Sequence, residues 1–217
     1  MPALTLLLMF TLANLLFLAG ATVVFEGLGN RAVEIRLFYG PKVFSVSWRG
    51  RTFSVGILPL GGYVQPERPP FMNWEFGKSS LPPIAAVTIL VLVGVGLLGP
   101  TRAWAELIAG FQQFISGTFS PLATGKVLCG NILKFMKEAP LPLAFGMVAI
   151  KIAATSFVPA PTGPLGAILF HGIGKLLRLS TRTMEYLQLV GALAMFLALG
   201  CWIVALLAYL ASGNPST

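Results

Sequence analysis

Few residues in this chain could carry out catalysis or hold a metal. The sequence contains one histidine, His171, no aspartate, and two cysteines, Cys129 and Cys201, that stand far apart. Catalytic zinc normally takes three protein ligands from His, Asp, Glu or Cys, and this inventory offers no plausible set. A serine or cysteine nucleophile needs an adjacent base, and His171 is the only imidazole. We therefore expect no metal, no cofactor and no catalytic site, with His171 at the inner end of a membrane helix.

The composition indicates an integral membrane protein. Hydrophobic residues make up 56% of the 217 positions and charged residues only 10%, unlike a typical soluble domain. Crossing about 30 Å of hydrocarbon takes roughly 20 apolar residues in a helix. Three charge-free stretches reach this length, at 1–25, 79–101 and 186–217, and 139–170 does so apart from Lys151. We predict an all-α polytopic membrane protein with about four transmembrane helices and a small membrane-associated β-hairpin after the first.

The chain is expected to form a single membrane domain of six segments. The four transmembrane helices alternate with a β-hairpin region and an amphipathic segment on the outer side. In chain order the segments are the first helix (1–28), the hairpin region (30–66), the second helix (79–101), the amphipathic segment (102–139), the broken third helix (140–170) and the fourth helix (184–211).

Lysine and arginine gather in two loops, and this predicts the topology. The first loop carries such residues from Arg31 to Lys78, and the last carries Lys175, Arg178 and Arg182. Because positive loops face the cytoplasm, we expect the hairpin loop there and both termini on the outer side of a bacterial inner membrane. The net charge of +8 then requires no nucleic acid. Anionic lipid is the expected partner of the basic loops.

The region after the first helix predicts a β-hairpin with one apolar face. Apolar and polar residues alternate on both sides of a two-residue turn at Arg49-Gly50. An earlier strand over 33–39 is expected to end at Gly40-Pro41. The alternating apolar positions are Phe44, Val46, Trp48, Phe53, Val55 and Ile57.

Two features shape the second half of the chain. Between 102 and 139, large apolar residues recur at helical spacing opposite Glu106, Gln112 and Gln113, which predicts an amphipathic helix on the outer membrane surface. Prolines between 159 and 164 interrupt the third transmembrane helix. Irregular backbone at membrane depth survives where protein or a water-filled cavity satisfies its polar groups, so something must pack against this break.

The order of these parts resembles the site-2 protease family, the intramembrane zinc metalloproteases that cut transmembrane helices of other proteins. The resemblance covers nearly the whole chain. Its most specific part runs from Gly29 to Val64, where the family carries Phe-Gly-Pro-Lys, a hairpin, and Pro-Leu-Gly-Gly-Tyr-Val. Here Tyr39-Gly40-Pro41-Lys42 and Pro59-Leu60-Gly61-Gly62-Tyr63-Val64 stand at the matching places.

The residues that make active members catalytic are replaced. Their His-Glu-x-Gly-His motif places two zinc ligands on one helix face and a general base between them. The matching segment is Phe17-Leu18-Ala19-Gly20-Ala21, in which only the glycine persists. The family's third ligand, an aspartate after two prolines, corresponds to Pro164, and its asparagine to Ser156. The resemblance therefore implies an inactive member, degenerate at Phe17, Leu18, Ala21 and Pro164.

The resemblance also implies a surface for a protein partner. In active members the hairpin edge and the glycine pair hold an unwound substrate as an added strand, and losing the metal does not remove that surface. The alternative is that the hairpin merely packs against the helices. The expected partner-binding residues are Phe53, Val55, Gly61, Gly62, Tyr63, Lys151, Pro159 and Pro161.

Lys151 is a charge inside a predicted transmembrane helix, which requires a partner or a route to the interface. It could extend to the outer surface. It could instead pair with a carboxylate of a partner helix, or with Glu26 if the fold brings that residue near.

We favour a catalytically inactive, site-2-protease-like subunit that binds other integral membrane proteins, as a structural, assembly or regulatory component of a larger complex. An alternative is a membrane carrier or channel that uses the former active-site cavity, with Lys151 and the proline break lining it. An active intramembrane metalloprotease is the least favoured hypothesis, because Phe17 would fill the space where zinc should sit.

Overall fold

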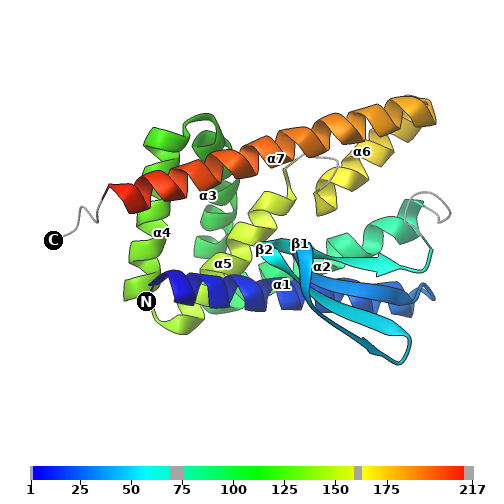
Figure 1. Cartoon of the computed structure of the whole chain (residues 1–217), viewed down its shortest axis with the longest axis horizontal. Helices are drawn as coiled ribbons and strands as arrows, with labels where there is room; N and C mark the ends of the chain where they lie inside the picture. Colours follow the sequence, from blue (N-terminus) through cyan, green and yellow to red (C-terminus); the bar gives the residue numbers. More distant parts are fainter. Residues whose placement is uncertain (1, 69–75, 159–162, 213–217) are drawn as a thin grey trace.

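The computed structural model describes residues 2–68, 76–158 and 163–212. Helices dominate it, and one β-sheet follows the first helix (Figure 1). The elements in chain order are α1 (Pro2–Gly27), β1 (Ala32–Trp48), β2 (Arg51–Pro66), α2 (Phe76–Leu98), α3 (Pro100–Phe119), the π-helix η1 (Pro121–Gly125), α4 (Lys126–Glu138), α5 (Leu141–Ser156), α6 (Pro164–Leu176) and α7 (Thr181–Ala211).

Three helices among the described residues are long and apolar enough to cross a membrane, namely α1, α2 and the part of α7 from 182 to 211. This fits the predicted integral membrane protein. The expected fourth helix is divided at the predicted break into α5, with 16 residues, and α6, with 13. At 1.5 Å per residue neither piece alone spans about 30 Å, so the number of candidate spans is three and not four.

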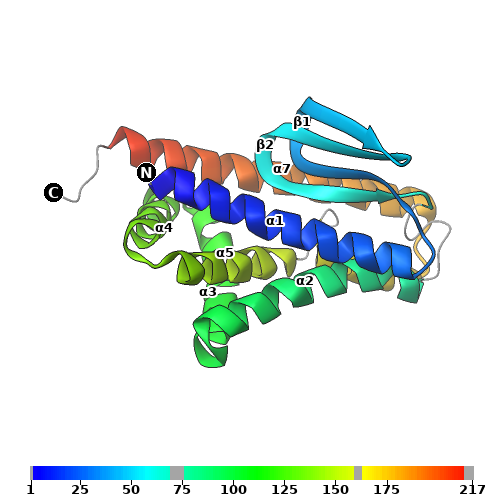
Figure 2. The ribbon, with the colours of Figure 1, turned by 90° about the horizontal axis from the view of Figure 1, so that it is seen from below.

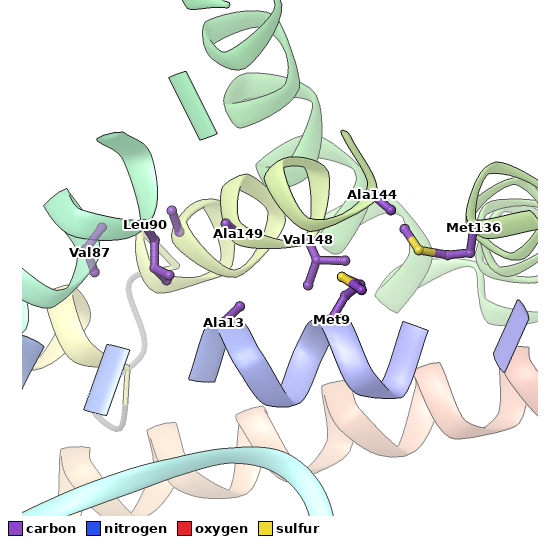
Figure 3. Close-up of a cluster of buried hydrophobic side chains, with 9 residues drawn as sticks. Met9, Ala13, Val87, Leu90, Met136, Ala144, Val148 and Ala149 are labelled. Carbon is purple, nitrogen blue, oxygen red and sulfur yellow. The ribbon is translucent and has the colours of Figure 1, made fainter. Parts of the chain in front are cut away.

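Helices α1, α2 and α5 form the core, and α4 closes one end of it. Met9 and Ala13 of α1 face Val148 of α5 (Figure 3). Small residues allow the helices to approach closely, as in many membrane proteins. A methyl group on Gly20 would lie 2.6 Å from the side chain of Ile89 in α2.

Helix α3 is amphipathic, as its pattern predicts, and it buries small residues where it meets its neighbours. Leu107 packs against the core cluster and Phe114 stacks on Trp202. Trp104, 65% exposed, points away from the protein. The buried residues are small, at Ala103, Gly110 and Gly117. A methyl group on Gly117 would lie 2.5 Å from the ring of Trp202 in α7, so this stripe is where α3 meets its neighbours.

The turn after α1 sets the direction of the sheet. The amide of Gly29 donates to the carbonyl of Glu26 and that of Asn30 to Phe25, and Gly29 has φ of 75°. This is the Schellman arrangement, in which glycine adopts the left-handed conformation that ends a helix. The buried side chain of Asn30 then donates to the Arg68 carbonyl and accepts from its amide, at 2.9 and 3.0 Å. The start of β1 is thereby joined to the end of β2.

Strands β1 and β2 form an antiparallel hairpin around the predicted turn at Arg49-Gly50. Both strands bend, with Phe38, Gly40 and Gly61 at positive φ. The hairpin folds back on itself, so Ile35 lies opposite both Phe53 and Val64. The predicted end of a strand at Gly40-Pro41 is therefore a bend within β1. Figure 2 shows the sheet on one side of α1 and α2 on the opposite side.

Two glycines of α2 provide a test of the core packing. A methyl group on Gly94 would lie 2.2 Å from Cγ1 of Ile150 in α5, whereas one on Gly96 would meet nothing within 4 Å. We expect Gly94→Ala to destabilise the protein by about 1–3 kcal/mol through overpacking. Gly96→Ala should leave stability unchanged or raise it by up to about 1 kcal/mol. Reversible unfolding of both variants in detergent measures this, and equal effects would contradict the α2–α5 packing.

Candidate partner-binding site

The positions that match the zinc-binding motif lie within packed apolar surroundings. Leu18 and Ala21 are 2% and 5% exposed, and half-buried Phe17 packs against the core cluster. These side chains carry no lone pair for a metal and no base. Leu18 also approaches the sheet, because a methyl group on Gly62 would lie 3.0 Å from its Cδ1. The motif positions therefore contribute to packing between α1 and its neighbours.

The second half of the matching pattern lies at the break between α5 and α6. Ser156 is buried and donates to the Ile152 carbonyl at 3.0 Å. Pro164 is the first residue of α6, and the adjacent Leu165 packs against the same core cluster as Phe17. The fold thus brings both parts of the pattern to one hydrophobic cluster. Pro159 and Pro161 lie outside the described residues.

Residues able to hold a metal do not come together in the described ranges, where no group of three or more His, Cys, Asp or Glu side chains forms. His171 lies on α6 and its Nδ1 is 2.9 Å from the Ala167 carbonyl one turn earlier. Its Nε2 is 3.3 Å from Nε2 of Gln188 on α7. His171 therefore joins α6 to α7.

Lys151 has an intramolecular partner that the sequence analysis did not identify. Its Nζ lies 2.7 Å from Oε2 of Glu106 on α3, and it also donates to Oε1 of Gln113 at 3.0 Å. The two charged side chains are 22% and 28% exposed. The expected alternative pair with Glu26 is wrong, because Glu26 lies 2.9 Å from Arg51 at the tip of the hairpin. Lys151 thus ties α5 to α3.

The sheet has one apolar and one polar face, because directly opposed residues share a face. One apolar row crosses the sheet through Val46, Phe53, Ile35 and Val64, and the next runs through Phe44, Val55, Leu37 and Gly62. Since Gly62 approaches Leu18, the apolar face is turned toward α1. The polar rows are Ser45, Ser54, Arg36 and Tyr63, then Ser47, Thr52, Glu34 and Gln65.

The predicted contact residues Phe53 and Val55 lie half-buried in the middle of these rows. The outer rim, residues 42–48, is paired on one side only within the described chain. On it Phe44 is 60% and Val46 46% exposed. The sequence pattern identified these side chains as apolar, but it could not show that they would remain uncovered.

Gly61, Gly62 and Tyr63 are accounted for by contacts within the sheet. A methyl group on Gly62 would lie 2.4 Å from the Arg36 carbonyl oxygen, so close strand packing requires glycine there. Gly61 has φ of 113°, a conformation that disfavours other residues. Tyr63 lies beside Tyr39, with ring centroids 6.1 Å apart, and Tyr39 donates to the Gly62 carbonyl at 3.4 Å.

The sheet extends along α1 and does not project from its end. Its tip meets the helix at the Arg51–Glu26 pair, and Gly61 lies opposite Asn14, where a methyl group would be 3.7 Å from the Asn14 Oδ1. Twelve residues separate Glu26 from Asn14, which is about 18 Å of helix. Asn14 is itself buried, at 5% exposed. A large part of α1 is therefore flanked by strands.

Glu34 contacts two polar side chains on the polar face of the sheet. Its Oε1 accepts from Ser54 at 2.9 Å and lies 2.9 Å from Nζ of Lys42. The hydrogen bond from Lys42 lowers the pKa of Glu34, and the Ser54 hydrogen bond acts in the same direction against the opposing effect of burial. The charged form of Glu34 is thus favoured in the folded sheet.

No family model, no curated protein and no solved structure matches this chain.

The coupling free energy between Lys151 and Glu106 can be measured with a double-mutant cycle. We expect Lys151→Met and Glu106→Gln each to destabilise the protein by about 1–3 kcal/mol, because each leaves a half-buried charge without its partner. The stability lost by the double variant should be at least about 1 kcal/mol smaller than the sum of the losses in the two single variants. Unfolding in detergent provides the four free energies. A coupling near zero would favour a lysine that extends to the membrane surface.

The lowered pKa of Glu34 predicts a pH dependence of the sheet. The pKa of an unfolded glutamate is about 4.3, so the pair stabilises the fold above that pH and its contribution is lost as pH falls through the lower folded pKa. Hydrogen exchange of hairpin amides, corrected for intrinsic rates, should reveal faster opening toward about pH 3. Glu34→Gln should remove this acid step, whereas Glu138→Gln, at an exposed position of α4, should retain it. An unchanged acid step in Glu34→Gln would contradict the assignment.

Proposed function

We propose that this chain is a catalytically inactive, site-2-protease-like membrane protein that binds a segment of another integral membrane protein along its hairpin sheet. It acts as a structural, assembly or regulatory subunit of a larger complex. The observation that carries this proposal is the combination of apolar packing at the motif positions with a sheet rim that keeps apolar side chains exposed. Phe17 and Leu18 are the packed residues at the motif positions. Phe44 and Val46 are the exposed apolar residues of the rim.

The position of the sheet along α1 supports a protein partner. With α1 crossing the bilayer, strands that reach Asn14 lie alongside the apolar span. Open sheet edges do not face lipid, because each unsatisfied backbone group costs several kcal/mol in hydrocarbon. The rim at 42–48 pairs on one side only within the described chain. A partner strand would satisfy these groups.

The side chains of the rim define the chemistry of this partner. Phe44, Val46 and Trp48 alternate with Ser45 and Ser47, so the two faces of an added strand would meet different surfaces. The matching segment is extended and carries apolar residues at alternate positions. Backbone hydrogen bonds would supply affinity and the apolar side chains would supply specificity.

The proposal is tested in the native membrane with two pairs of lysine substitutions on the same strand. Phe44→Lys with Val46→Lys alters the apolar face, and Ser45→Lys with Ser47→Lys adds the same charge on the other face. Residues 41–50 are all exposed, so both pairs should fold. After gentle extraction, we expect a stoichiometric membrane partner with the wild type and the serine pair. The apolar-face pair should retain at least about tenfold less, equivalent to about 1.4 kcal/mol.

Three results would contradict the proposal. Equal retention by both variant pairs would exclude the apolar rim as the binding surface. Zinc bound at one ion per purified chain would contradict catalytic inactivity. A solitary monomer with a continuous water-filled polar path would favour the carrier or channel alternative. In that alternative Lys151 lines the path, whereas here it contacts Glu106 and Gln113.

A further inference from the structure

A cavity of about 300 Å³ lies at the tip of the hairpin, lined by Arg31, Trp48, Arg49 and Arg51. Three of its four lining residues are arginines. They come from the link after α1 and from both sides of the hairpin turn. The fold-back of the sheet therefore gathers cations that are separated by up to 20 positions in sequence.

The arginines are held in place by contacts with the turn. Arg31 donates through Nη2 to the Arg49 carbonyl, and the Arg31 carbonyl accepts from the Glu67 amide at 2.8 Å. The Arg49 guanidinium lies 4.8 Å from the ring centroid of Trp48. Arg51 pairs with Glu26 at 2.9 Å. The cavity is thus lined by oriented groups.

The cavity carries an excess of positive charge. Three of its lining residues are arginines, and Glu26 pairs with one of them. Glu67 and Arg68, at the base of the hairpin, carry opposite charges that offset one another. Each guanidinium presents five donors in a fixed planar fork, so contacts to one carbonyl or one carboxylate leave donors available. An anion in the cavity would relieve the repulsion and accept these hydrogen bonds.

The location of the cavity favours a membrane anion. Arg51 contacts Glu26 in the last turn of α1, a helix long and apolar enough to cross the bilayer. The cavity therefore lies at the level where this helix leaves the hydrocarbon. Trp48 is 61% exposed, and tryptophan is enriched at this interface. Arginine forks match the oxygens of phosphate.

We propose that this cavity binds the phosphate group of an anionic phospholipid headgroup. Arg31 and Arg49 contact the phosphate oxygens, Arg51 adds positive charge from its pair with Glu26, and Trp48 packs against the glycerol and upper acyl region. This site shares Trp48 with the rim, but its three arginines lie outside residues 42–48, and lipid binding requires only the chain and a bilayer.

The test compares two double variants that remove the same charge. Arg31→Gln with Arg49→Gln alters the cavity and leaves the Arg51–Glu26 pair intact. Lys134→Gln with Lys137→Gln removes the same charge at two exposed positions of α4, outside both basic loops. Each protein is placed in nanodiscs of phosphatidylcholine and phosphatidylglycerol, released gently, and examined by native mass spectrometry for retained lipid.

We expect the wild type and the control variant to retain phosphatidylglycerol in preference to phosphatidylcholine. The cavity variant should lose this preference by about tenfold or more, because each arginine near an anionic surface contributes about 1 kcal/mol. An equal loss of this preference in the control would show that retention depends on net charge alone, and it would overturn the site. Unchanged retention by a cavity variant with the same melting temperature would also overturn it.

A second arm separates lipid from free phosphate. Inorganic phosphate is added to the protein in phosphatidylcholine nanodiscs, and protection of the hairpin tip is followed by hydrogen exchange. We expect protection with phosphatidylglycerol and little with inorganic phosphate. Equal protection by inorganic phosphate alone would overturn the assignment to a lipid headgroup. Neither arm involves a protein partner, so failure here leaves the proposed subunit function separately testable.

Discussion

The reversal of the chain after α1 is the constraint on which the remaining arrangement depends. Gly29 closes the helix in a left-handed conformation, and a side chain there would cost roughly 1–2 kcal/mol. Asn30 then binds both backbone groups of Arg68 and joins the two ends of the hairpin. Because the chain turns back, the sheet lies along α1, the tip returns to Glu26, and the outer rim faces away from the helix bundle.

A second constraint is that polar groups in apolar surroundings need partners, and the chain satisfies it unevenly. Inside the helical part, Lys151 contacts Glu106 and Gln113, so these two polar residues of α3 face α5. On the sheet, Glu34 binds Lys42 and Ser54. Lys151 and Glu34 thus have partners within the chain. The single-sided pairing of the rim within the described chain is the basis of the proposed partner surface, and the arginines at the tip are the basis of the proposed lipid site.

Local sequence patterns predicted the elements well and their contacts poorly. Apolar length predicted α1, α2 and α7, and alternation around Arg49-Gly50 predicted the hairpin. The orientation of α3 could not be predicted, because its periodicity defines two faces without stating which one meets protein. The partner of Lys151 was missed for the same reason, since Glu106 lies 45 positions away on another helix. The two-sided pairing of Ile35 is likewise a tertiary contact.

The glycine pair that carries the resemblance to a protease family has a sufficient explanation in the sheet itself. Gly62 must lie against the Arg36 carbonyl and the side chain of Leu18, and Gly61 occupies a bend at positive φ. In this chain the close approach of the hairpin to its own backbone and to α1 is enough to require small residues at both points. The glycine pair therefore reflects how the hairpin packs, and Phe17 and Leu18 belong to the apolar packing around α1. Function is then to be sought where the fold leaves interactions incomplete, at the exposed rim and in the arginine-lined cavity.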